Sequence, residues 1–307
     1  VLHNGSPVEL PWADKVSAIL EMYLGGQGVG EACDRLLYGE ANPSGRLAET
    51  FPYRLEDNPS FLHFPGNGKR VLYGEDIFVG YRYYDTKKVP VRYAFGHGLS
   101  YTEFTYGDLT LSSAQMTDED ILTVSFKVKN TGKTEGKEVV QLYVADLCGI
   151  SERPVKELKG FAKVHLLPGE EKTVSMEISA RNLSYYEERL GDWYAPSGTY
   201  RILIGHASDD IRLHADIVFE TQKELPLRVD FTTTFGELLD HTKTAPVITE
   251  LLAPLAAAAA SAEGMSDEYK KLGEQVIREM PLKSLLGQMP GEQVEQLIGQ
   301  LNCLLAQ

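Results

Sequence analysis

The sequence has 307 residues, about twice a common domain length, so we expect two domains or one domain with a large extension. Hydrophobic residues make up 43% and charged residues 24%, which excludes a wholly disordered or fibrous chain. The formal net charge of -14 repels phosphate backbones and anionic lipid headgroups, so we expect neither nucleic acid nor a membrane as partner.

The first 38 residues combine a short strand pattern with two helical patterns. Val1-Leu2, ahead of a Gly/Ser/Pro loop, is typical of the end of a buried strand. Between Ala13 and Tyr23 the apolar residues fall at helical spacing and Gly25-Gly26 follows as a stop, which predicts an amphipathic helix. A second helix is predicted from Gly28 to Tyr38. Together these elements indicate an α/β domain.

Residues 42–67 contain strong turn signals, which predict a long structured surface loop. Residues 71–106 are unusually aromatic, and aromatic side chains at this density usually seal an interface. The aromatic residues are Tyr73, Phe78, Tyr81, Tyr83, Tyr84, Tyr93, Phe95, Tyr101, Phe104 and Tyr106.

Strict alternation of apolar and polar residues begins at Ile121 and predicts a half-buried strand, with Phe126 and Val128 on its apolar face. The run 138–145 is apolar on both faces, so we expect it to be covered on both. Further strands are predicted at 158–166, 174–178, 200–204 and 213–219, with a Pro168-Gly169 turn after the first of them. Short alternating strands of this number indicate an immunoglobulin-like antiparallel β-sandwich.

After residue 224 the composition shifts to Leu, Ala, Glu and Lys, and helical spacing returns. The longest apolar run, 251–260, is too short to span a bilayer, and we interpret it as helix or linker. Pro290 lies near the start of the clearest helix. Its apolar stripe consists of Val294, Leu297, Ile298, Leu301 and Leu305.

Two side-by-side carboxylates, Glu75 and Asp76, lie among aromatic residues, and glycoside cleavage uses a pair of carboxylates. Adjacent residues of an extended chain point to opposite faces, however, and the two catalytic groups must face each other across a cleft. Pairing of one of them with Arg82, or simple solvation, is therefore the favoured interpretation. Arg82 and Asp85 carry the same ambiguity.

Other motifs give weak signals for metal, phosphate or serine chemistry. The glycines of residues 25–30 do not fit G-x-G-x-x-G, so a helix junction is favoured over phosphate binding. Ser100 lacks the second glycine of G-x-S-x-G and is interpreted as a turn serine. Five scattered histidines lack zinc-ligand spacing, and three distant cysteines indicate neither a disulfide framework nor a metal site. We expect no metal and no cofactor. These residues are His63, His97, His206, His214 and His241, and Cys33, Cys148 and Cys303.

The two tryptophans are candidates for sugar stacking, because an indole has an apolar face and a polar tip. For Trp12 we favour core packing. For Trp193, which follows Gly191-Asp192, both interpretations stay open.

Several strings, taken in order along residues 1–220, resemble family 3 glycoside hydrolases of the β-glucosidase type. In the first part they are Asn4-Gly5-Ser6-Pro7-Val8, Pro11-Trp12, Leu37-Tyr38-Gly39, Asn42-Pro43-Ser44-Gly45-Arg46-Leu47, Thr50-Phe51-Pro52, Tyr73-Gly74-Glu75-Asp76-Ile77-Phe78-Val79-Gly80-Tyr81-Arg82-Tyr83-Tyr84 and Phe95-Gly96-His97-Gly98-Leu99-Ser100-Tyr101-Thr102. Val128-Lys129-Asn130-Thr131-Gly132, Glu138-Val139-Val140-Gln141-Leu142-Tyr143-Val144 and Glu157-Leu158-Lys159-Gly160-Phe161 resemble the family's fibronectin type III-like domain.

The resemblance implies an α+β multidomain chain, with part of an α/β sandwich domain at 1–103, a fibronectin type III-like β-sandwich at 104–222 and a helical tail at 223–307. In the family a barrel donates an Asp nucleophile and the α/β sandwich a Glu acid/base. Neither motif is matched here, and both should precede Val1. We therefore predict no catalytic residue, and the substrate-binding residues stay unknown.

The resulting hypothesis is a portion of a retaining β-glycosidase that acts on terminal β-D-glycosides and is inactive alone. The alternative is a non-catalytic carbohydrate-binding or adhesive module. The exposed half-domain should favour self-association. The helical tail resembles extensions of bacterial members, which implies a bacterial, cytoplasmic protein, and secretion stays open because the sequence does not begin with Met.

Overall fold

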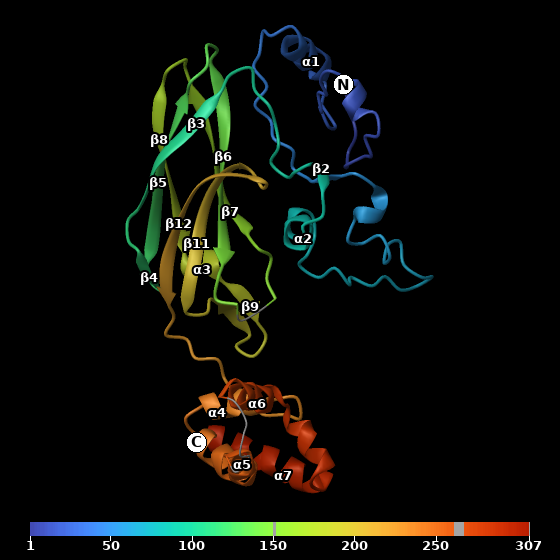
Figure 1. Ribbon diagram of the computed structural model, residues 1–307. Helices are drawn as coiled ribbons and strands as arrows, with labels where there is room; N and C mark the ends of the chain where they lie inside the picture. Colours follow the sequence, from blue (N-terminus) through green and yellow to red (C-terminus); the bar gives the residue numbers. More distant parts are fainter. Residues whose placement is uncertain (150–151, 261–266, 307) are drawn as a thin grey trace. The chain divides into compact units, whose positions relative to one another are not determined.

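The computed structural model describes residues 1–149, 152–260 and 267–306 (Figure 1). The chain divides into two compact units, Val1–Glu224 and Leu225–Gln307. The predicted boundaries within the first unit, at residues 103 and 104, stay predictions.

The most regular part of the first unit is a β-sandwich of two sheets. The order is β4-β12-β11-β6-β7 in the larger sheet and β3-β5-β8 in the smaller one. Neighbouring strands are antiparallel except β12 and β4, which pair in parallel. The strands are β3 (Phe104–Leu111), β4 (Gln115–Thr117), β5 (Ile121–Asn130), β6 (Gly136–Asp146), β7 (Glu157–Leu166), β8 (Glu171–Ser179), β11 (Gly198–Ala207) and β12 (Asp210–Glu220).

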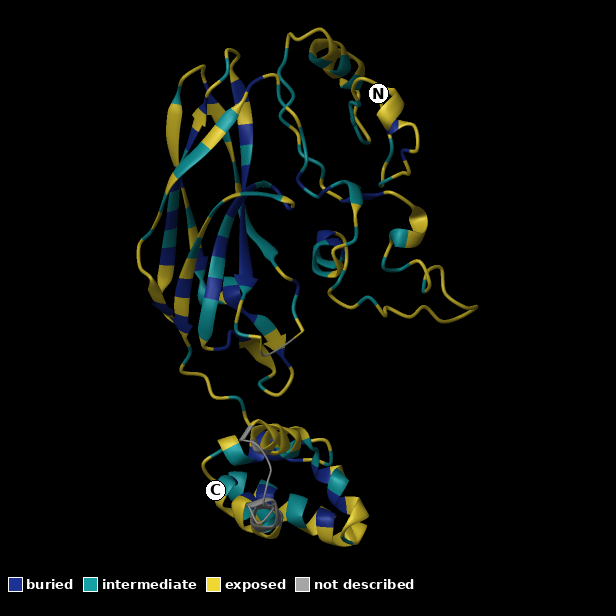
Figure 2. Ribbon diagram, viewed as in Figure 1, coloured by how far each residue is buried: buried dark blue, intermediate teal, exposed yellow. Residues whose placement is uncertain are grey.

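Side-chain alternation along these strands builds the sandwich core (Figure 2). On β5, Phe126 and Val128 are fully buried while the residues between them are less buried, which confirms the predicted pattern. Strand β6 lies between β11 and β7 in the sheet, and its buried residues lie on both of its faces. Gly169 has a φ of 79°, as the predicted Pro-Gly turn requires.

A small hairpin is inserted between β8 and β11. It consists of β9 (Tyr185–Glu187) and β10 (Asp192–Tyr194), and it follows the short helix α3 (Ala180–Leu183). The register pairs Trp193 with Tyr186 and Tyr194 with Tyr185. Alternation therefore separates an outer Trp193–Tyr186 face from an inner face that carries the buried Tyr194.

Residues 1–103 are mostly irregular. Their elements are η1 (Ala13–Lys15), α1 (Val29–Leu37), β1 (Phe51–Pro52), η2 (Leu55–Asp57), α2 (Tyr81–Lys87) and β2 (Val91–Tyr93), with β1 and β2 paired. The predicted second helix is present as α1, although none of its residues is buried.

The helix predicted from Ala13 to Tyr23 is wrong beyond η1. Val16 has extended backbone angles, and Leu2 forms a parallel bridge with Glu21. Its amide donates to the carbonyl of Leu20 at 2.8 Å and its carbonyl accepts from Met22 at 2.9 Å. Because these bonds require extended residues around position 21, long-range pairing overrides the local helical spacing.

The second unit is helical and has its own apolar cluster. Its elements are α4 (Phe235–Asp240), α5 (Ala245–Ala260), α6 (Asp267–Glu279), η3 (Leu282–Gly287) and α7 (Gly291–Ala306). Val294 and Leu301 of the predicted stripe are fully buried, and the helix starts directly after Pro290, as predicted. Asn302 fixes the preceding chain, because its side chain both accepts from and donates to the backbone of Val229, at 2.9 and 2.8 Å. Within the described residues, no helix is long and apolar enough to span a membrane.

Candidate functional site

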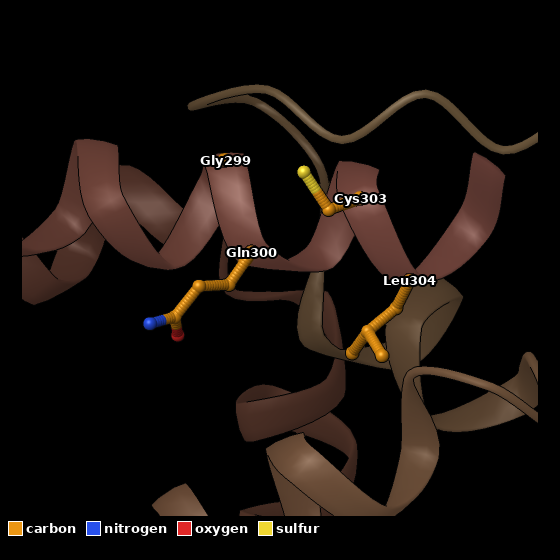
Figure 3. Close-up of a pocket in the computed structure, with 4 residues that line it drawn as sticks. All are labelled: Gly299, Gln300, Cys303 and Leu304. Carbon is orange, nitrogen blue, oxygen red and sulfur yellow. The ribbon is translucent and has the colours of Figure 1, made fainter. Parts of the chain in front are cut away.

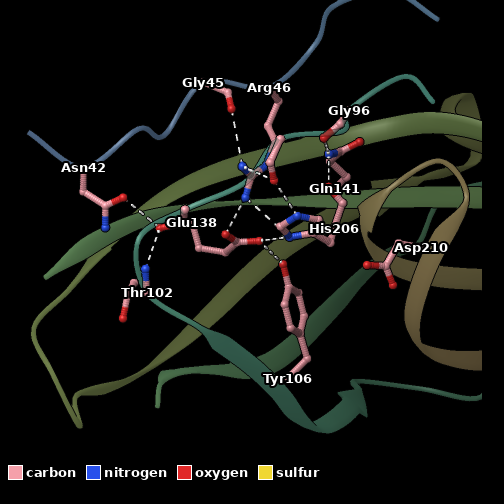
Figure 4. Close-up of polar contacts among 12 residues, drawn as sticks. Asn42, Gly45, Arg46, Gly96, Thr102, Tyr106, Glu138, Gln141, His206 and Asp210 are labelled. Atoms are coloured by element: carbon pink, nitrogen blue, oxygen red, sulfur yellow. Dashed lines mark hydrogen bonds and ion pairs between the residues drawn. The ribbon is translucent and has the colours of Figure 1, made fainter. Parts of the chain in front are cut away.

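Motif strings that are far apart in the sequence meet where residues 42–46 and 96–102 contact the β-sandwich (Figure 4). We call this contact the junction; it is centred on Arg46, Gly98, Tyr106, Glu138 and His206. All five belong to the first unit. The junction contains the most extensive buried polar network among the motif residues.

The carboxylate of Glu138 is the centre of the junction. Its side chain is 0% exposed, and its Oε2 accepts from Arg46 Nη2 at 2.6 Å, while that Arg46 side chain is only 6% exposed. Its Oε1 accepts from the Tyr106 hydroxyl and from His206 Nδ1, both at 2.6 Å. A buried carboxylate is tolerated when cations and donors surround it in this way. Burial and the neighbouring Glu138 raise the pKa of Tyr106, so its hydroxyl stays a donor.

The junction also binds a backbone carbonyl of the preceding segment. Arg46 Nη1 donates to the Gly98 carbonyl at 2.9 Å, and His206 Nε2 lies 2.9 Å from the same oxygen. Both ring nitrogens of His206 therefore face oxygen acceptors, the carbonyl on one side and the Glu138 carboxylate on the other. This geometry is satisfied by an imidazole ring that carries a hydrogen on both nitrogens.

Asn42 and Ser100 extend the junction with hydrogen bonds to the backbone. Asn42 Oδ1 accepts from the Ser100 hydroxyl at 3.0 Å and from the Tyr101 amide at 2.8 Å, and Asn42 Nδ2 donates to the Glu135 carbonyl at 2.9 Å. Ser100 therefore serves a turn, as predicted, and is not placed as a nucleophile.

Glycines of the motif strings allow the close approach of the two parts. Gly96 has a φ of 83°, and a Cβ there would lie 2.4 Å from Gln141 Oε1. A Cβ on Gly132 would lie 2.2 Å from the Thr102 hydroxyl oxygen. No side chain fits at either position without displacement of its neighbours.

The aromatic connector contacts the sandwich through α2. Tyr81 is 6% exposed, stacks on Phe95 with ring centroids 4.8 Å apart, and accepts from the Leu158 amide at 2.8 Å. The predicted sealing role is confirmed here, although Tyr73 is 80% exposed.

The charged residues near the connector pair differently from the favoured interpretation. Arg82 Nε lies 3.3 Å from Glu157 Oε1, and Asp85 Oδ2 lies 2.7 Å from Lys156 Nζ. Pairing of Glu75 or Asp76 with Arg82 is therefore wrong as a description of this arginine. Burial opposes the charge of Glu157, but Lys159, Arg153 and Arg82 hold its pKa below the usual value.

Glu75 and Asp76 do not form a catalytic pair with each other. Asp76 is exposed with a φ of 49°, and Glu75 is partly buried, with its Oε2 lacking a hydrogen-bond partner. In the part of the chain that the structure describes, no group of three or more His, Cys, Asp or Glu residues could hold a metal ion. The absence of predicted catalytic residues stays a prediction.

The structure places Trp12 and Trp193 on the surface, each 38% exposed. The expectation of core packing for Trp12 is wrong, because the small nearby cluster contains only Leu10, Ala13 and Phe51 as buried members. The glycine segment ends at Gly28, which caps α1, in agreement with a helix junction. A depression on α7, lined by Gly299, Gln300, Cys303 and Leu304, has no charged group to act on a substrate (Figure 3).

Sequence reasoning did not identify Arg46, Glu138 or Tyr106 as members of one site. One signal was available: Glu138 is a carboxylate at the start of a strand that is otherwise apolar on both faces, and such a charge needs a buried partner.

Comparison with known proteins agrees with the positions of the motif strings. Residues 1–101 match the glycosyl hydrolase family 3 C-terminal domain, and residues 138–208 match a fibronectin type III-like domain. The thermostable β-glucosidase B of Acetivibrio thermocellus is 45% identical over 306 residues, which is 98% of this chain and 40% of that protein.

Two solved structures support the same assignment. The β-glucosidase from Kluyveromyces marxianus in complex with glucose has a TM-score of 0.67 and 43% identity, over 71% of this chain and 26% of that one. The family 3 β-glucosidase of Bifidobacterium adolescentis has a TM-score of 0.73 and 37% identity, over 80% of this chain and 36% of that one. The chain thus spans well under half the length of these relatives. It belongs to glycoside hydrolase family 3 and corresponds to the C-terminal portion of its β-glucosidases.

Proposed function

We propose that the chain is the scaffold portion of a retaining β-glucosidase that hydrolyses terminal β-D-glycosides, and that it is inactive alone. The observation that carries the proposal is the junction, where the family's motif residues are used to fix backbone and buried charge. Glu138 is 0% exposed and already bound by Arg46, Tyr106 and His206, so it is not free to act on a glycoside.

A retaining glycosidase needs two carboxyl groups about 5–5.5 Å apart, one as nucleophile and one as acid/base. In the family these groups come from the barrel and from the first part of the α/β sandwich. We propose that sequence preceding Val1 supplies both of them. The role of residues 1–224 is then to hold the acid/base domain in a fixed position.

The test compares the chain alone with a chimera in which the preceding part of the Acetivibrio thermocellus relative is fused ahead of Val1. We expect a nitrophenyl β-glucoside to be hydrolysed by the chimera and not by the chain. Hydrolysis by the chain alone that is lost in Glu75→Gln would contradict the inactivity, and a folded chimera without any glycosidase activity would contradict the parent function.

The alternative, a non-catalytic carbohydrate-binding module, has one observation in its favour. Trp193 and Tyr186 lie on the same outer face of the β9–β10 hairpin and are 38% and 53% exposed. The two functions are compatible, because a binding surface on the sandwich can accompany catalysis elsewhere in the enzyme.

A further inference from the structure

The β9–β10 hairpin presents two aromatic rings on its outer face. Tyr186 and Trp193 are directly paired across the two strands, with ring centroids 5.7 Å apart and planes at 76°. The alternation that points them outward points Tyr185, Glu187 and Tyr194 inward, and of these Glu187 and Tyr194 are buried.

The inner face makes the hairpin rigid without help from the outer rings. Glu187 accepts from Arg189 Nε at 2.8 Å and from the Tyr185 hydroxyl at 3.1 Å. The hydrogen bond to Arg189 lowers the pKa of Glu187 to about 2, so the carboxylate stays charged. Tyr185 and Tyr194 meet edge to face at 6.0 Å, and the Arg153 guanidinium lies 5.6 Å from the Tyr185 ring.

Charged groups of both signs border the outer rings. The Arg181 guanidinium carbon lies 3.1 Å from the centroid of the Trp193 ring and covers one face of the indole. Asp192 Oδ2 pairs with Lys223 Nζ at 2.9 Å, and the same ammonium group donates to the Trp193 carbonyl at 3.0 Å. The border therefore offers hydrogen-bond donors and acceptors in fixed positions next to an apolar surface.

Stabilisation of the hairpin is the simpler explanation of this arrangement, since a cross-strand aromatic pair and a cation–π contact both stabilise a two-stranded ribbon. It accounts for the contact between the rings but not for their exposure. The inner tyrosines and Glu187 already hold the strands together, and a smaller outer pair would expose less apolar surface.

We propose that Tyr186 and Trp193 form a binding surface for a neutral β-linked gluco-oligosaccharide. A β-glucopyranose ring has equatorial hydroxyls around its rim and apolar C–H groups on both faces, so a face stacks on an aromatic ring while the hydroxyls meet Arg181, Asp192 and Lys223. The net charge of -14 disfavours an anionic polysaccharide. The choice of a glucan rests on the proposed function, whereas the surface rests on the hairpin alone.

Isothermal titration of the chain with cellohexaose and laminarihexaose tests the surface. We expect binding with a dissociation constant between about 1 mM and 1 μM. Trp193→Ala and Tyr186→Ala should each weaken it about tenfold or more. Trp12→Ala is the matched control, because Trp12 has the same 38% exposure and lies far away in the sequence, in η1's flank. This control should bind like the unchanged protein.

Several outcomes overturn the proposal: no heat of binding up to millimolar sugar, equal weakening in Trp12→Ala, or unchanged affinity in both hairpin variants. Circular dichroism and thermal unfolding show whether each variant is folded, and Trp193→Phe, which keeps a ring, should retain part of the affinity if stacking is responsible. Preference for a xylo-oligosaccharide over both glucans would overturn the glucan. Hydrolysis by the chimera without binding by the chain would sink this surface alone, and binding without chimera activity would sink the proposed function alone.

Discussion

The β-sandwich and the segment that precedes it solve the problem of burial differently. Among the described residues, the sandwich encloses a cluster of 18 buried apolar residues, whereas the main cluster of residues 1–103 has 3, namely Leu10, Ala13 and Phe51. The sandwich alternates apolar and polar residues along strands that pair with one another. The earlier segment has two short strands, and its helix α1 buries nothing.

The consequence is that the earlier segment depends on its contacts with the sandwich. Large apolar side chains stay exposed there, with Leu24 at 79% and Leu62 at 87%. Fixed contacts are instead made by the junction and by α2. Motifs that identify the family in residues 42–46 and 96–102 therefore act here as attachment residues.

The largest expected effect comes from Glu138→Ala. It leaves the 6% exposed Arg46 guanidinium without its carboxylate, and removal of one partner of a buried ion pair costs about 3–5 kcal/mol. We expect the free energy of unfolding to fall by this amount in urea denaturation. Hydrogen exchange of the amides in residues 42–46 and 96–102 should rise more than exchange in β5.

Glu177→Ala is the control for that experiment. Glu177 is exposed on β8, at the outer face of the same sandwich, and its removal should change the free energy of unfolding by no more than about 0.5 kcal/mol. If both variants behave alike, the junction does not hold the segment.

Exposed apolar side chains of the earlier segment should drive association of the chain when it is produced alone. Burial of one leucine side chain stabilises a contact by about 1.5–3 kcal/mol, so Leu24→Glu together with Leu62→Glu should weaken association by more than tenfold. Sedimentation velocity at several concentrations measures this. Phe161→Glu, at an isolated 71% exposed ring on β7, is the matched change on the sandwich. A monomer at every concentration for the unchanged chain would refute the expectation.

Glycine substitutions should have opposite signs in the two places. Gly132→Ala puts a Cβ 2.2 Å from Thr102 Oγ1 and 3.0 Å from the Glu103 amide, and overpacking of this kind costs about 1–3 kcal/mol. Gly30→Ala, in α1, meets nothing within 4 Å and should stabilise by up to about 1 kcal/mol. Thermal unfolding separates the two, and equal destabilisation would mean that α1 is packed after all.

The same contrast explains which features the sequence predicts. The alternation in β5 depends only on neighbours along the strand, so Phe126 and Val128 were assigned correctly. The helix predicted at 13–23 failed because the pairing of Leu2 with Glu21 is not encoded in local spacing. The junction was missed for a related reason: Arg46 and Glu138 are 92 residues apart, and only the folded chain brings them to 2.6 Å.

The smallest expected effect concerns acid. Burial lowers the pKa of His97, against the opposing influence of Asp209, while the neighbouring His206 and Arg46 lower it further; the ring also stacks on Tyr93, with centroids 5.1 Å apart. Since the folded-state pKa lies below the ordinary value of 6.5, the unfolded chain binds the proton first. The contribution of His97 is therefore complete above about pH 6.5 and is lost as the pH falls through the folded-state pKa.

Denaturation at several pH values between 5 and 7.5 tests this sign. His97→Gln cannot be protonated, so its free energy of unfolding should fall less steeply below about pH 6.5, by at most about 1.4 kcal/mol per pH unit. The exposed His214→Gln on β12 should keep the slope of the unchanged protein. A steeper fall in His97→Gln would mean that the protonated ring stabilises the folded state, and that the junction, with its cluster of charges, dominates over burial at this position.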